Sequence, residues 1–285
     1  MILRSLLFVP ADRPDRFAKA AASGADAIIL DLEDSVLPER KAAGRAALAE
    51  WLSAERPIPA FVRVNPLATG LTAADLKAVM PGAPDGIVLP KAEGSASIDA
   101  IAALMGELSV PILPIATETP AALFALGSYA TVGERLAGLT WGAEDLPAAI
   151  GATTSREPDG RYTPPYELVR SLALFAAHAA GVAAIETVYP DVGDADGLTA
   201  YVARARRDGF TGMMAIHPRQ VEIINRGFTP TEQELRHARA VVEAFRTNDG
   251  AGALLLEGRM IDRPHLVQAE RLLALADRLA PPPSM

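Results

Sequence analysis

The chain of 285 residues is long enough for two average domains of ~150 residues each or for one large α/β barrel. Half of its residues are hydrophobic and 22% are charged, a balance that excludes an intrinsically disordered chain. A formal net charge of −8 argues against a nucleic-acid or anionic-membrane partner, and the absence of cysteine excludes disulfides, thiolate nucleophiles and cysteine-bound metals. We therefore expect a globular protein whose chemistry comes from oxygen and nitrogen groups.

No segment of the sequence is typical of export or of membrane insertion. The apolar run at residues 5–10 is shorter than the apolar region of a signal peptide. The longest uncharged stretches, residues 119–133 and 171–185, fall short of the ~20 residues that cross a bilayer. We expect a cytoplasmic protein without a membrane partner.

Short runs rich in Ile, Val and Leu recur along the chain between alanine-rich stretches of helical spacing. Because these runs are almost continuously apolar, they are typical of parallel strands that are buried on both faces. The stretches between them, such as Arg13–Ser23 and Pro38–Ala54, suit crossover helices. The predicted strands are Leu6–Pro10, Ala27–Asp34, Ala60–Asn65, Gly86–Glu93, Pro111–Glu118, Leu136–Asp145, Ala183–Asp191 and Gly212–His217.

The ends of the predicted strands have a nearly regular period. They fall at residues 10, 34, 65, 93, 118, 145, 191 and 217, so that most steps are 24 to 31 residues long and one is 46. One βα unit of a barrel takes about 30 residues, and both the count and the period predict a (β/α)8 barrel of the TIM type. The long step contains the polar segment Thr153–Arg161, which we interpret as a loop that overhangs the barrel mouth.

We divide the chain into a barrel, residues 1–228, and a C-terminal helical arm, residues 229–285. Thr229 is the predicted N-cap of the first arm helix, with Pro230 at the first helical position, and a last helix is expected over Pro264–Leu279. Such an arm would act as a lid or pack on a neighbouring subunit. The expected apolar face of the first helix consists of Leu235, Ala238, Val242 and Phe245.

Most predicted strands end in a polar or ionisable residue. The C-terminal ends of barrel strands meet at one mouth, where the active sites of this fold lie, so we expect these side chains to form a site. The residues are Asp31, Glu33 and Asp34, Arg63 and Asn65, Lys91 and Glu93, Glu118, Glu144 and Asp145, Asp191, and His217.

The acidic residues at the mouth have two interpretations. Asp31 and Glu33 project to the same side of their strand, where they could form structural salt bridges with the basic residues of the mouth. Glu118 and Asp145 end adjacent strands, and two neighbouring buried carboxylates repel each other unless a proton or a cation lies between them. A divalent cation meets this need, whereas the simpler interpretation is that both carboxylates cap the helices that follow.

The available ligands indicate the type of cation. Without cysteine or a close pair of histidines, an all-oxygen site suits Mg2+ or Mn2+ better than zinc, and two carboxylates leave positions for substrate oxygens and water. The planar guanidinium of Arg63 can bind a carboxylate at two points, although a structural ion pair explains it equally well. His178, His237 and His265 have no identifiable partner and are expected to be surface or packing residues.

Six segments along the chain form an ordered set: Arg4–Pro10, Leu30–Val36, Arg63–Asn65, Leu89–Lys91, Trp141–Asp145 and Ala215–Val221. This set resembles the citrate lyase beta-chain-like family. The family includes malyl-CoA and citramalyl-CoA lyases and belongs to the wider HpcH/HpaI class of metal-dependent aldolases. The resemblance extends over essentially the whole chain.

The resemblance implies roles for residues at the predicted barrel mouth. Glu118 and Asp145 would ligate Mg2+, with Mn2+ as a possible substitute. Arg63, together with Glu118 and Glu144, would bind the carboxylate or keto acid of the substrate.

The resemblance also implies a CoA site and a catalytic arm. Phe8, Arg13 and Lys19 match positions that contact CoA in malyl-CoA lyases. Gly258–His265 resembles a lid segment whose aspartate reaches the active site of an adjacent subunit, which makes Asp262 the candidate general acid/base. A helix N-cap is the simpler interpretation of Asp262. The family further implies a homo-oligomer, a trimer or hexamer.

The function expected from the site and the resemblance is that of a Mg2+-dependent carbon–carbon lyase. It would catalyse reversible Claisen-type cleavage of a 3-hydroxy-3-carboxyacyl-CoA thioester, such as malyl-CoA, citramalyl-CoA or a citryl-CoA-like compound, to a keto acid and acetyl-CoA. One alternative is a metal-dependent 2-oxo acid (pyruvate) aldolase that does not use CoA. Another is the beta subunit of a multi-subunit citrate lyase, which acts on an acyl-carrier-protein thioester.

Overall fold

The chain forms two compact units. The computed structural model describes residues 1–248 and 250–280. The first unit is Leu3–Asn225, and the second begins at Arg226 and includes Met1–Ile2. Among the residues described, no helix is both long enough and apolar enough to cross a membrane.

Parallel strands of the first unit form a closed barrel. Over the described residues, eight strands lie in one sheet of order β5-β4-β3-β2-β1-β8-β7-β6. The outermost strands, β5 and β6, are joined by parallel bridges between Ile112 and Leu136 and between Ile115 and Thr140, which close the sheet. The predicted (β/α)8 barrel is thus confirmed. The strands are β1 (Ser5–Pro10), β2 (Ala27–Asp31), β3 (Ala60–Arg63), β4 (Gly86–Leu89), β5 (Ile112–Pro114), β6 (Leu139–Thr140), β7 (Ala184–Glu186) and β8 (Gly212–Ala215).

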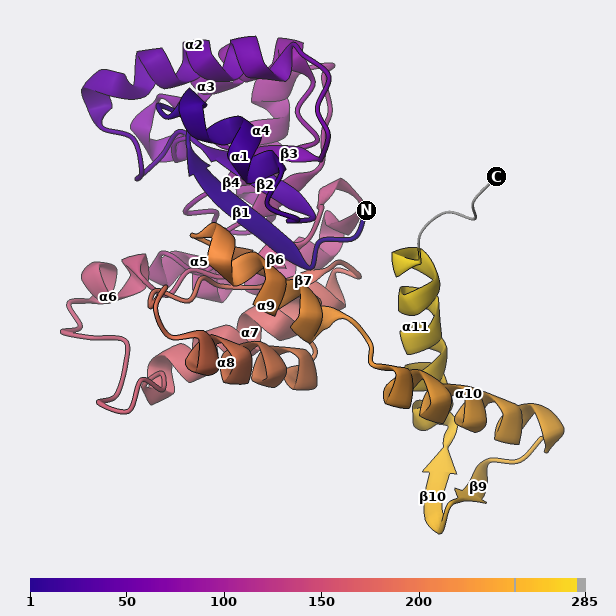
Figure 1. The fold of residues 1–285 in the computed structure, drawn as a ribbon. Coiled ribbons are helices and arrows are strands. Elements are labelled where there is room, and N and C mark those ends of the chain that lie inside the picture. Colours follow the sequence, from indigo (N-terminus) through magenta and orange to yellow (C-terminus); the bar gives the residue numbers. More distant parts are fainter. Residues whose placement is uncertain (249, 281–285) are drawn as a thin grey trace. The chain divides into compact units, whose positions relative to one another are not determined.

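Helical segments follow each barrel strand, as the colour gradient of Figure 1 shows. The α-helices are α1 (Phe17–Ala21), α2 (Lys41–Leu52), α3 (Thr72–Val79), α4 (Ser95–Met105), α5 (Pro120–Ala125), α6 (Asp145–Ile150), α7 (Pro164–Ala179), α8 (Ala195–Asp208) and α9 (Pro218–Phe228). The 3-10 helices are η1 (Pro14–Arg16), η2 (Pro38–Arg40), η3 (Leu67–Thr69), η4 (Met80–Gly82), η5 (Leu126–Thr131) and η6 (Gly133–Arg135).

Several strands are shorter than the sequence predicts. The end of β2 shows the reason, because the Asp31 carboxylate accepts the backbone N–H groups of Glu33 (2.8 Å) and Ser35 (3.3 Å) and turns the chain out of the sheet. In the same way Glu118 lies in the loop after β5, and Asp145 begins α6. The polar residues that we placed at strand ends therefore lie at the ends or in the loops that follow.

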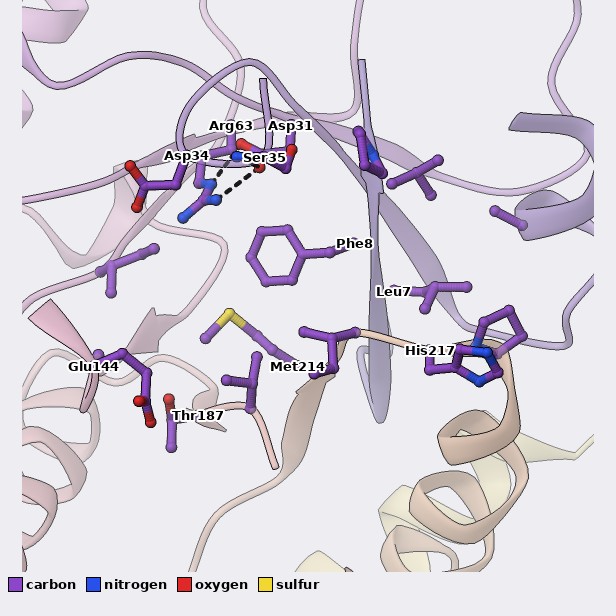
Figure 2. Close-up of a pocket in the computed structure, with 18 of the residues that line it drawn as sticks. Leu7, Phe8, Asp31, Asp34, Ser35, Arg63, Glu144, Thr187, Met214 and His217 are labelled. Carbon is purple, nitrogen blue, oxygen red and sulfur yellow. Dashed lines mark hydrogen bonds and ion pairs between the residues drawn. The ribbon is translucent and has the colours of Figure 1, made fainter. Parts of the chain in front are cut away.

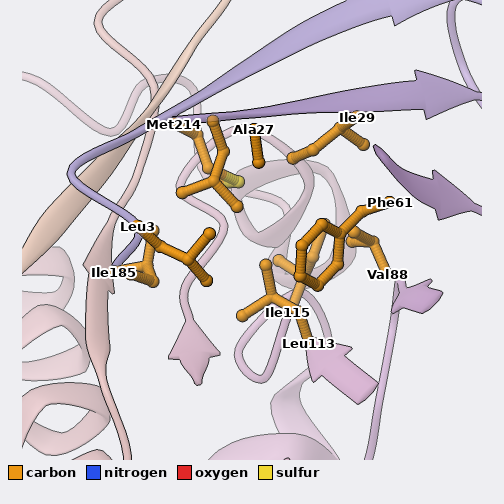
Figure 3. Packing of buried hydrophobic residues seen from close by; sticks show 10 residues of the cluster. Leu3, Ala27, Ile29, Phe61, Val88, Leu113, Ile115, Ile185 and Met214 are labelled. Atoms are coloured by element: carbon orange, nitrogen blue, oxygen red, sulfur yellow. The ribbon is translucent and has the colours of Figure 1, made fainter. Parts of the chain in front are cut away.

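The barrel interior is filled by side chains of alternate strand residues (Figure 3). Ile29 of β2 and Phe61 of β3 are completely or almost completely buried there. Because side chains two positions apart lie on the same face of a strand, Asp31 and Arg63 project on the interior side, one layer nearer the C-terminal mouth. The apolar interior thus supports the charged layer above it. The buried cluster comprises Leu3, Leu6, Ala27, Ile29, Phe61, Val88, Leu113, Ile115, Ile185 and Met214.

The second unit contains α10 (Glu232–Thr247), the antiparallel hairpin of β9 (Ala253–Leu256) and β10 (Arg259–Asp262), and α11 (Arg263–Leu279). The predicted N-cap of its first helix was wrong. Thr231, not Thr229, caps α10, because Thr231 and Glu234 form a reciprocal capping box. The sequence offered two threonines on either side of Pro230, each with a glutamate three residues later, Glu232 and Glu234, so that the pattern alone did not distinguish them. The core of the unit consists of Ala238, Val241, Phe245, Ile261 and Ala269.

Candidate active site

A cavity of about 710 Å3 lies at the C-terminal ends of the barrel strands. Figure 2 shows Arg63 and Asp31 on one side of it and Glu144 and Thr187 on the other. Most of the predicted site residues line this cavity: Phe8, Lys19, Arg63, Glu118, Glu144 and Asp145. Its position is the one at which barrel proteins carry their active sites.

Arg63 and Asp31 form a two-point ion pair at the mouth. Arg63 Nε donates to Asp31 Oδ1 at 2.6 Å and Nη2 donates to Oδ2 at 2.7 Å. Burial alone would raise the pKa of Asp31, but the charge and hydrogen bonds of Arg63 outweigh it and hold that pKa below its usual value. The guanidinium also lies 4.8 Å from the centre of the Phe8 ring. The structural salt bridge that we considered for Asp31 is therefore present.

Glu33 and Lys91 extend this charge network towards the loop after β6. Lys91 Nζ lies 2.8 Å from Glu33 Oε1 and 3.1 Å from Asp145 Oδ1. Glu33 Oε2 lies 2.7 Å from Arg63 Nη1 without the alignment of a hydrogen bond. Lys91 thus connects the basic and acidic sides of the mouth. We did not predict this contact, because it depends on how the side chain extends from the turn after β4.

Glu118 is a buried carboxyl group of the mouth with a raised pKa. It is 4% exposed, and its Oε2 accepts the backbone N–H of Lys91 at 2.6 Å. Burial raises its pKa to about 8, and the negative charges of Asp145 and Glu33 contribute in the same direction. Without a nearby cation, Glu118 is therefore mainly protonated at neutral pH.

The mouth carries more acidic than basic groups. The carboxylates of Asp31, Glu33 and Asp145 pair with the cationic side chains of Arg63 and Lys91, whereas Glu118 accepts only the backbone N–H of Lys91. Two negative charges are therefore unbalanced when all four carboxylates are ionised, and one when Glu118 is protonated. A divalent cation would supply that balance. Over the described residues, no group of three or more acidic or histidine side chains forms a metal cluster.

Gly142 makes room for Glu118. A Cβ atom at position 142 would lie 2.6 Å from Glu118 Cγ and 2.9 Å from its Oε1. We expect Gly142→Ala to displace this carboxylate and to weaken divalent-cation binding about tenfold or more, as measured by Mn2+ titration. Gly127→Ala is the matched control, because open space surrounds that position. Equal Mn2+ affinity in both variants would contradict this role of Gly142.

A buried polar cluster supports the loop that carries Gly142–Asp145. Glu186 Oε1 accepts Trp141 Nε1–H at 2.5 Å and the backbone N–H of Thr187 at 2.9 Å, and Arg170 Nε donates to Glu186 Oε2 at 2.7 Å. Glu186 is completely buried, and Thr187 lines the cavity. One carboxylate thus ties the ends of β6 and β7 together on the outside of the barrel.

Basic residues at the start of the first helical segment differ in their surroundings. Lys19 and Arg16 line the cavity. Arg13 does not line it and instead forms a two-point ion pair with the exposed Asp15, at 2.9 and 2.8 Å. Arg16, which the sequence analysis did not single out, therefore has the position at the cavity that we expected of Arg13.

Some polar residues at the predicted strand ends do not line the cavity and instead form hydrogen bonds within or between loops. Asn65 donates to Asp75 at 2.7 Å, Glu93 accepts the hydroxyl of Thr119 at 2.6 Å, and Asp191 accepts backbone N–H groups of its own loop. The segment Thr153–Arg161, which we expected above the mouth, contributes no lining residue.

The sequence analysis also missed lining residues that carry no charge or lie just beyond a strand. Of these missed residues, Ile115 belongs to the inward-facing layer, and Thr187 and Met214 lie at the ends of β7 and β8. Because side chains alternate between the two faces of a strand, counting every second residue of β8 would have identified Met214. The residues of the loops follow no such alternation and would not have been found. The missed lining residues are Leu7, Val9, Pro10, Arg16, Ala20, Ser35, Ile115, Gly142, Ala143, Thr187, Val188, Met214, Ile216 and Pro218.

Asp262 lies in the second unit, where it is the N-cap of α11. Its side chain accepts a backbone N–H in a capping box with His265. His265 Nδ1 lies 2.5 Å from Asp262 Oδ1, and a proton on Nδ1 would be donated to this carboxylate. The capping role that we considered for Asp262 is present, and the expectation that His265 has no partner was wrong. His178 also has a partner, since its Nε2 lies 3.1 Å from the carbonyl oxygen of Gly209.

The fold and the cavity define a (β/α)8 barrel with an acidic site at the C-terminal ends of its strands. The sequence profile of one family, HpcH/HpaI aldolase/citrate lyase, matches residues 4–218. The chain belongs to this family, as its motifs predicted, and citrate lyase beta-like members of the family are lyases.

Similar proteins and structures cover almost the whole chain. The citrate lyase subunit beta-like protein of Mycobacterium tuberculosis is 39% identical over 271 residues, which are 95% of this chain and 94% of that protein. The (3S)-malyl-CoA thioesterase of Cereibacter sphaeroides is 33% identical over 97% of this chain and 95% of its own length. The crystal structure of the protein CitE from Mycobacterium tuberculosis, in complex with magnesium, acetoacetate and coenzyme A, has a TM-score of 0.83 and 38% identity. It covers 97% of this chain and 98% of its own.

Proposed function

We propose that this protein is a Mg2+-dependent carbon–carbon lyase. The reaction is the reversible Claisen-type cleavage of a 3-hydroxy-3-carboxyacyl-CoA thioester to a keto acid and acetyl-CoA. The observation that carries the proposal is the pair of Glu118 and Asp145 beside Arg63 in the cavity, at a mouth with more carboxylates than cationic partners. The similar CitE structure, in complex with magnesium, acetoacetate and coenzyme A, supports this assignment of ligands.

Glu118 and Asp145 are the proposed Mg2+ ligands. The donor set fits a hard cation, because both ligands are carboxylates and the sequence has no cysteine. The buried Glu118 carboxyl, with its raised pKa, gains a counter-charge from such an ion. When bound, Mg2+ supplies a positive charge that stabilises negative charge on substrate oxygens.

Arg63 is the proposed partner of the substrate carboxylate. Asp31 accepts only part of the N–H groups that a guanidinium offers, and it fixes the plane of the group. The remaining N–H groups can donate to a carboxylate in the cavity, where Arg63 would also stabilise negative charge that develops during cleavage. Glu144, on the far side of the cavity, would bind a hydroxyl group of the substrate.

CoA would enter beside α1. Lys19 and Arg16 line this part of the cavity and offer positive charge to its phosphates, and Arg13 precedes them on the same segment. The half-buried Phe8 offers an apolar surface to the pantetheine chain.

Asp262 is the proposed general acid/base. In the cleavage direction it would donate the proton that converts the thioester enolate to acetyl-CoA, and in synthesis it would remove that proton. We propose that the chain acts as a homo-oligomer, a trimer or hexamer, in which the arm of one copy completes the site of another.

Arg63→Lys is expected to reduce kcat/KM about 10- to 100-fold, mainly through KM. Lysine keeps the charge but lacks the two-point geometry that Arg63 uses with Asp31. Steady-state kinetics with varied acyl-CoA would measure this change. Mn2+ affinity is the control, and it should stay close to that of the unmodified protein. A variant with unchanged KM would remove Arg63 from substrate binding.

A turnover panel of CoA thioesters tests the function directly. With Mg2+, malyl-CoA, citramalyl-CoA or a citryl-CoA-like substrate should yield an acetyl-CoA peak and an equal amount of keto acid. EDTA should abolish the reaction and excess Mg2+ should restore it. Free CoA without keto acid would instead indicate thioester hydrolysis, a reaction that the name of the Cereibacter sphaeroides relative favours. Turnover that survives EDTA would contradict the metal site.

A role as the beta subunit of a multi-subunit lyase is the second candidate. It is favoured by the citrate lyase subunit beta of Leuconostoc mesenteroides subsp. cremoris, which is 32% identical over 96% of this chain. Activity of the purified protein alone on CoA thioesters would exclude this candidate. Cleavage of pyruvate aldols without CoA would point to the remaining alternative, a pyruvate aldolase.

A further inference from the structure

We propose that Lys91 is a positioning residue which holds the carboxylates of the metal site in place until a divalent cation binds. Its ammonium group would be a temporary counter-ion that the arriving cation displaces from Asp145. This inference rests on the proposed function, because it takes Glu118 and Asp145 as the metal ligands.

One residue contacts three carboxylates of the mouth. The backbone N–H of Lys91 donates to Glu118 Oε2 at 2.6 Å, and its Nζ lies 2.8 Å from Glu33 Oε1 and 3.1 Å from Asp145 Oδ1. The side chains of Lys91 and Asp145 are about one third exposed, at 31% and 32%, whereas that of Glu33 is 4% exposed. Lys91 can therefore move towards solvent, while Glu33 and Glu118 remain fixed.

The backbone of Lys91 has an unfavourable conformation for a residue with a side chain. Its φ angle is +50°, in the left-handed region that favours glycine. Strain of this kind persists where the surrounding structure needs the conformation, and it is concentrated at functional sites. Here the conformation aims the N–H at Glu118 while the side chain reaches Glu33 and Asp145. Glycine would satisfy the backbone but would lose both side-chain contacts.

A lysine ammonium and a divalent cation cannot share Asp145 without cost. Both are positive, and both would use the same carboxylate of a half-buried site, where charges interact more strongly than in water. Arg63, the cation that shares Glu33 with Lys91, is held by Asp31, so it cannot replace Lys91 at Asp145. Removal of the lysine charge should therefore strengthen divalent-cation binding, although it leaves the cation-free site less well ordered.

Mn2+ binding to the full-length protein, followed by the EPR signal of free Mn2+, tests the proposal. We expect Lys91→Met to bind Mn2+ about tenfold more tightly than the unmodified protein. In the absence of metal, its Tm should fall by about 3 to 6 °C, because Glu33 and Asp145 lose their counter-ion. Saturating Mn2+ should then raise the Tm of the variant by more than it raises that of the unmodified protein. Lys91→Arg keeps the charge and should restore the original affinity.

The controls separate the charge of Lys91 from its structural role and from the metal site itself. Lys77→Met removes an exposed lysine of α3 and should leave Mn2+ affinity and Tm unchanged. If Lys91→Met does not fold, Lys91→Gly replaces it, since glycine accepts the backbone conformation and keeps the N–H for Glu118. Unchanged or weaker Mn2+ affinity in Lys91→Met, or in Lys91→Gly where it replaces that variant, or an equal gain in Lys91→Arg, would overturn the proposal. If the unmodified protein binds no Mn2+, the proposed metal site itself fails, which is a separate outcome.

Discussion

Glu118→Gln is expected to lower kcat for the proposed cleavage about a thousandfold, because an amide keeps the shape of the side chain but supplies no negative charge to a divalent cation. Mn2+ binding should weaken in parallel. Both are measured on the same preparation, by release of acetyl-CoA and by Mn2+ titration. Asp145→Asn should have an effect in the same direction. Glu134→Gln, at an exposed glutamate outside the cavity, is the matched control.

Glu118→Gln should not destabilise the metal-free protein. Burial raises the pKa of Glu118 from 4.5 to about 8, so the folded protein binds this proton more tightly than the unfolded chain does. The stability of the unmodified protein is therefore expected to fall as pH rises from 4.5 to about 8, and Gln at this position avoids that loss. Thermal unfolding at pH 5 and pH 8 without metal should show a Tm difference in favour of the variant at pH 8 only. A lower Tm of the variant at both values would mean that Glu118 mainly stabilises the fold.

The barrel was predictable because its signal is repeated along the chain. Each strand is buried on both faces and therefore apolar throughout, and the closed sheet requires one such strand about every 30 residues. The same pattern placed Arg63, Glu118 and Asp145 at the C-terminal ends of their strands. Because the strand ends of a barrel all meet at one mouth, residues of the mouth can be found from the strand pattern alone, without knowledge of any contact.

Contacts that depend on loop conformation were not predictable in the same way. Lys91 reaches Asp145 because its backbone adopts a positive φ angle, which no local sequence pattern indicates for lysine. Arg16 rather than Arg13 faces the cavity because a 3-10 turn precedes α1, which changes the direction of successive side chains. The sequence analysis named Lys91 as a residue of the mouth, and it placed the segment that contains Arg16 beside the CoA site. It did not predict where either side chain points, because that direction depends on the backbone angles.

The arm shows a comparable limit. Its helices and their apolar faces follow from helical periodicity, whereas the pairing of Asp262 with His265 depends on where α11 begins. We placed the helix start at Pro264, and the helix begins at Arg263, which makes Asp262 its N-cap and brings His265 to the third position of the helix. One residue of difference therefore decides which side chain the carboxylate meets.

Asp262→Asn separates the two roles that this residue can have. Asparagine caps a helix about as well as aspartate, so α11 should keep its start and the Tm of the protein should not change. Asparagine cannot transfer a proton, and loss of a general acid/base reduces rates about 100- to 10,000-fold, so kcat should fall within this range. Release of acetyl-CoA measures the loss, and binding of the keto acid, followed by calorimetry, should remain nearly intact. Turnover close to that of the unmodified protein would limit Asp262 to its capping role.

Complementation between two inactive variants tests where Asp262 acts. If the arm of one copy completes the cavity of another, coexpression of Asp262→Asn with Glu118→Gln creates sites in which the intact Asp262 and the intact Glu118 come from different chains. Such mixed oligomers should recover a measurable fraction of the original activity, whereas each variant alone stays inactive. If each site instead uses the Asp262 of its own chain, every site in the mixture carries one of the two defects and no activity returns. An unchanged Tm of Asp262→Asn shows that the helix cap is intact. With that result in hand, recovered activity assigns Asp262 to the active site of a neighbouring subunit, and no recovery excludes this role.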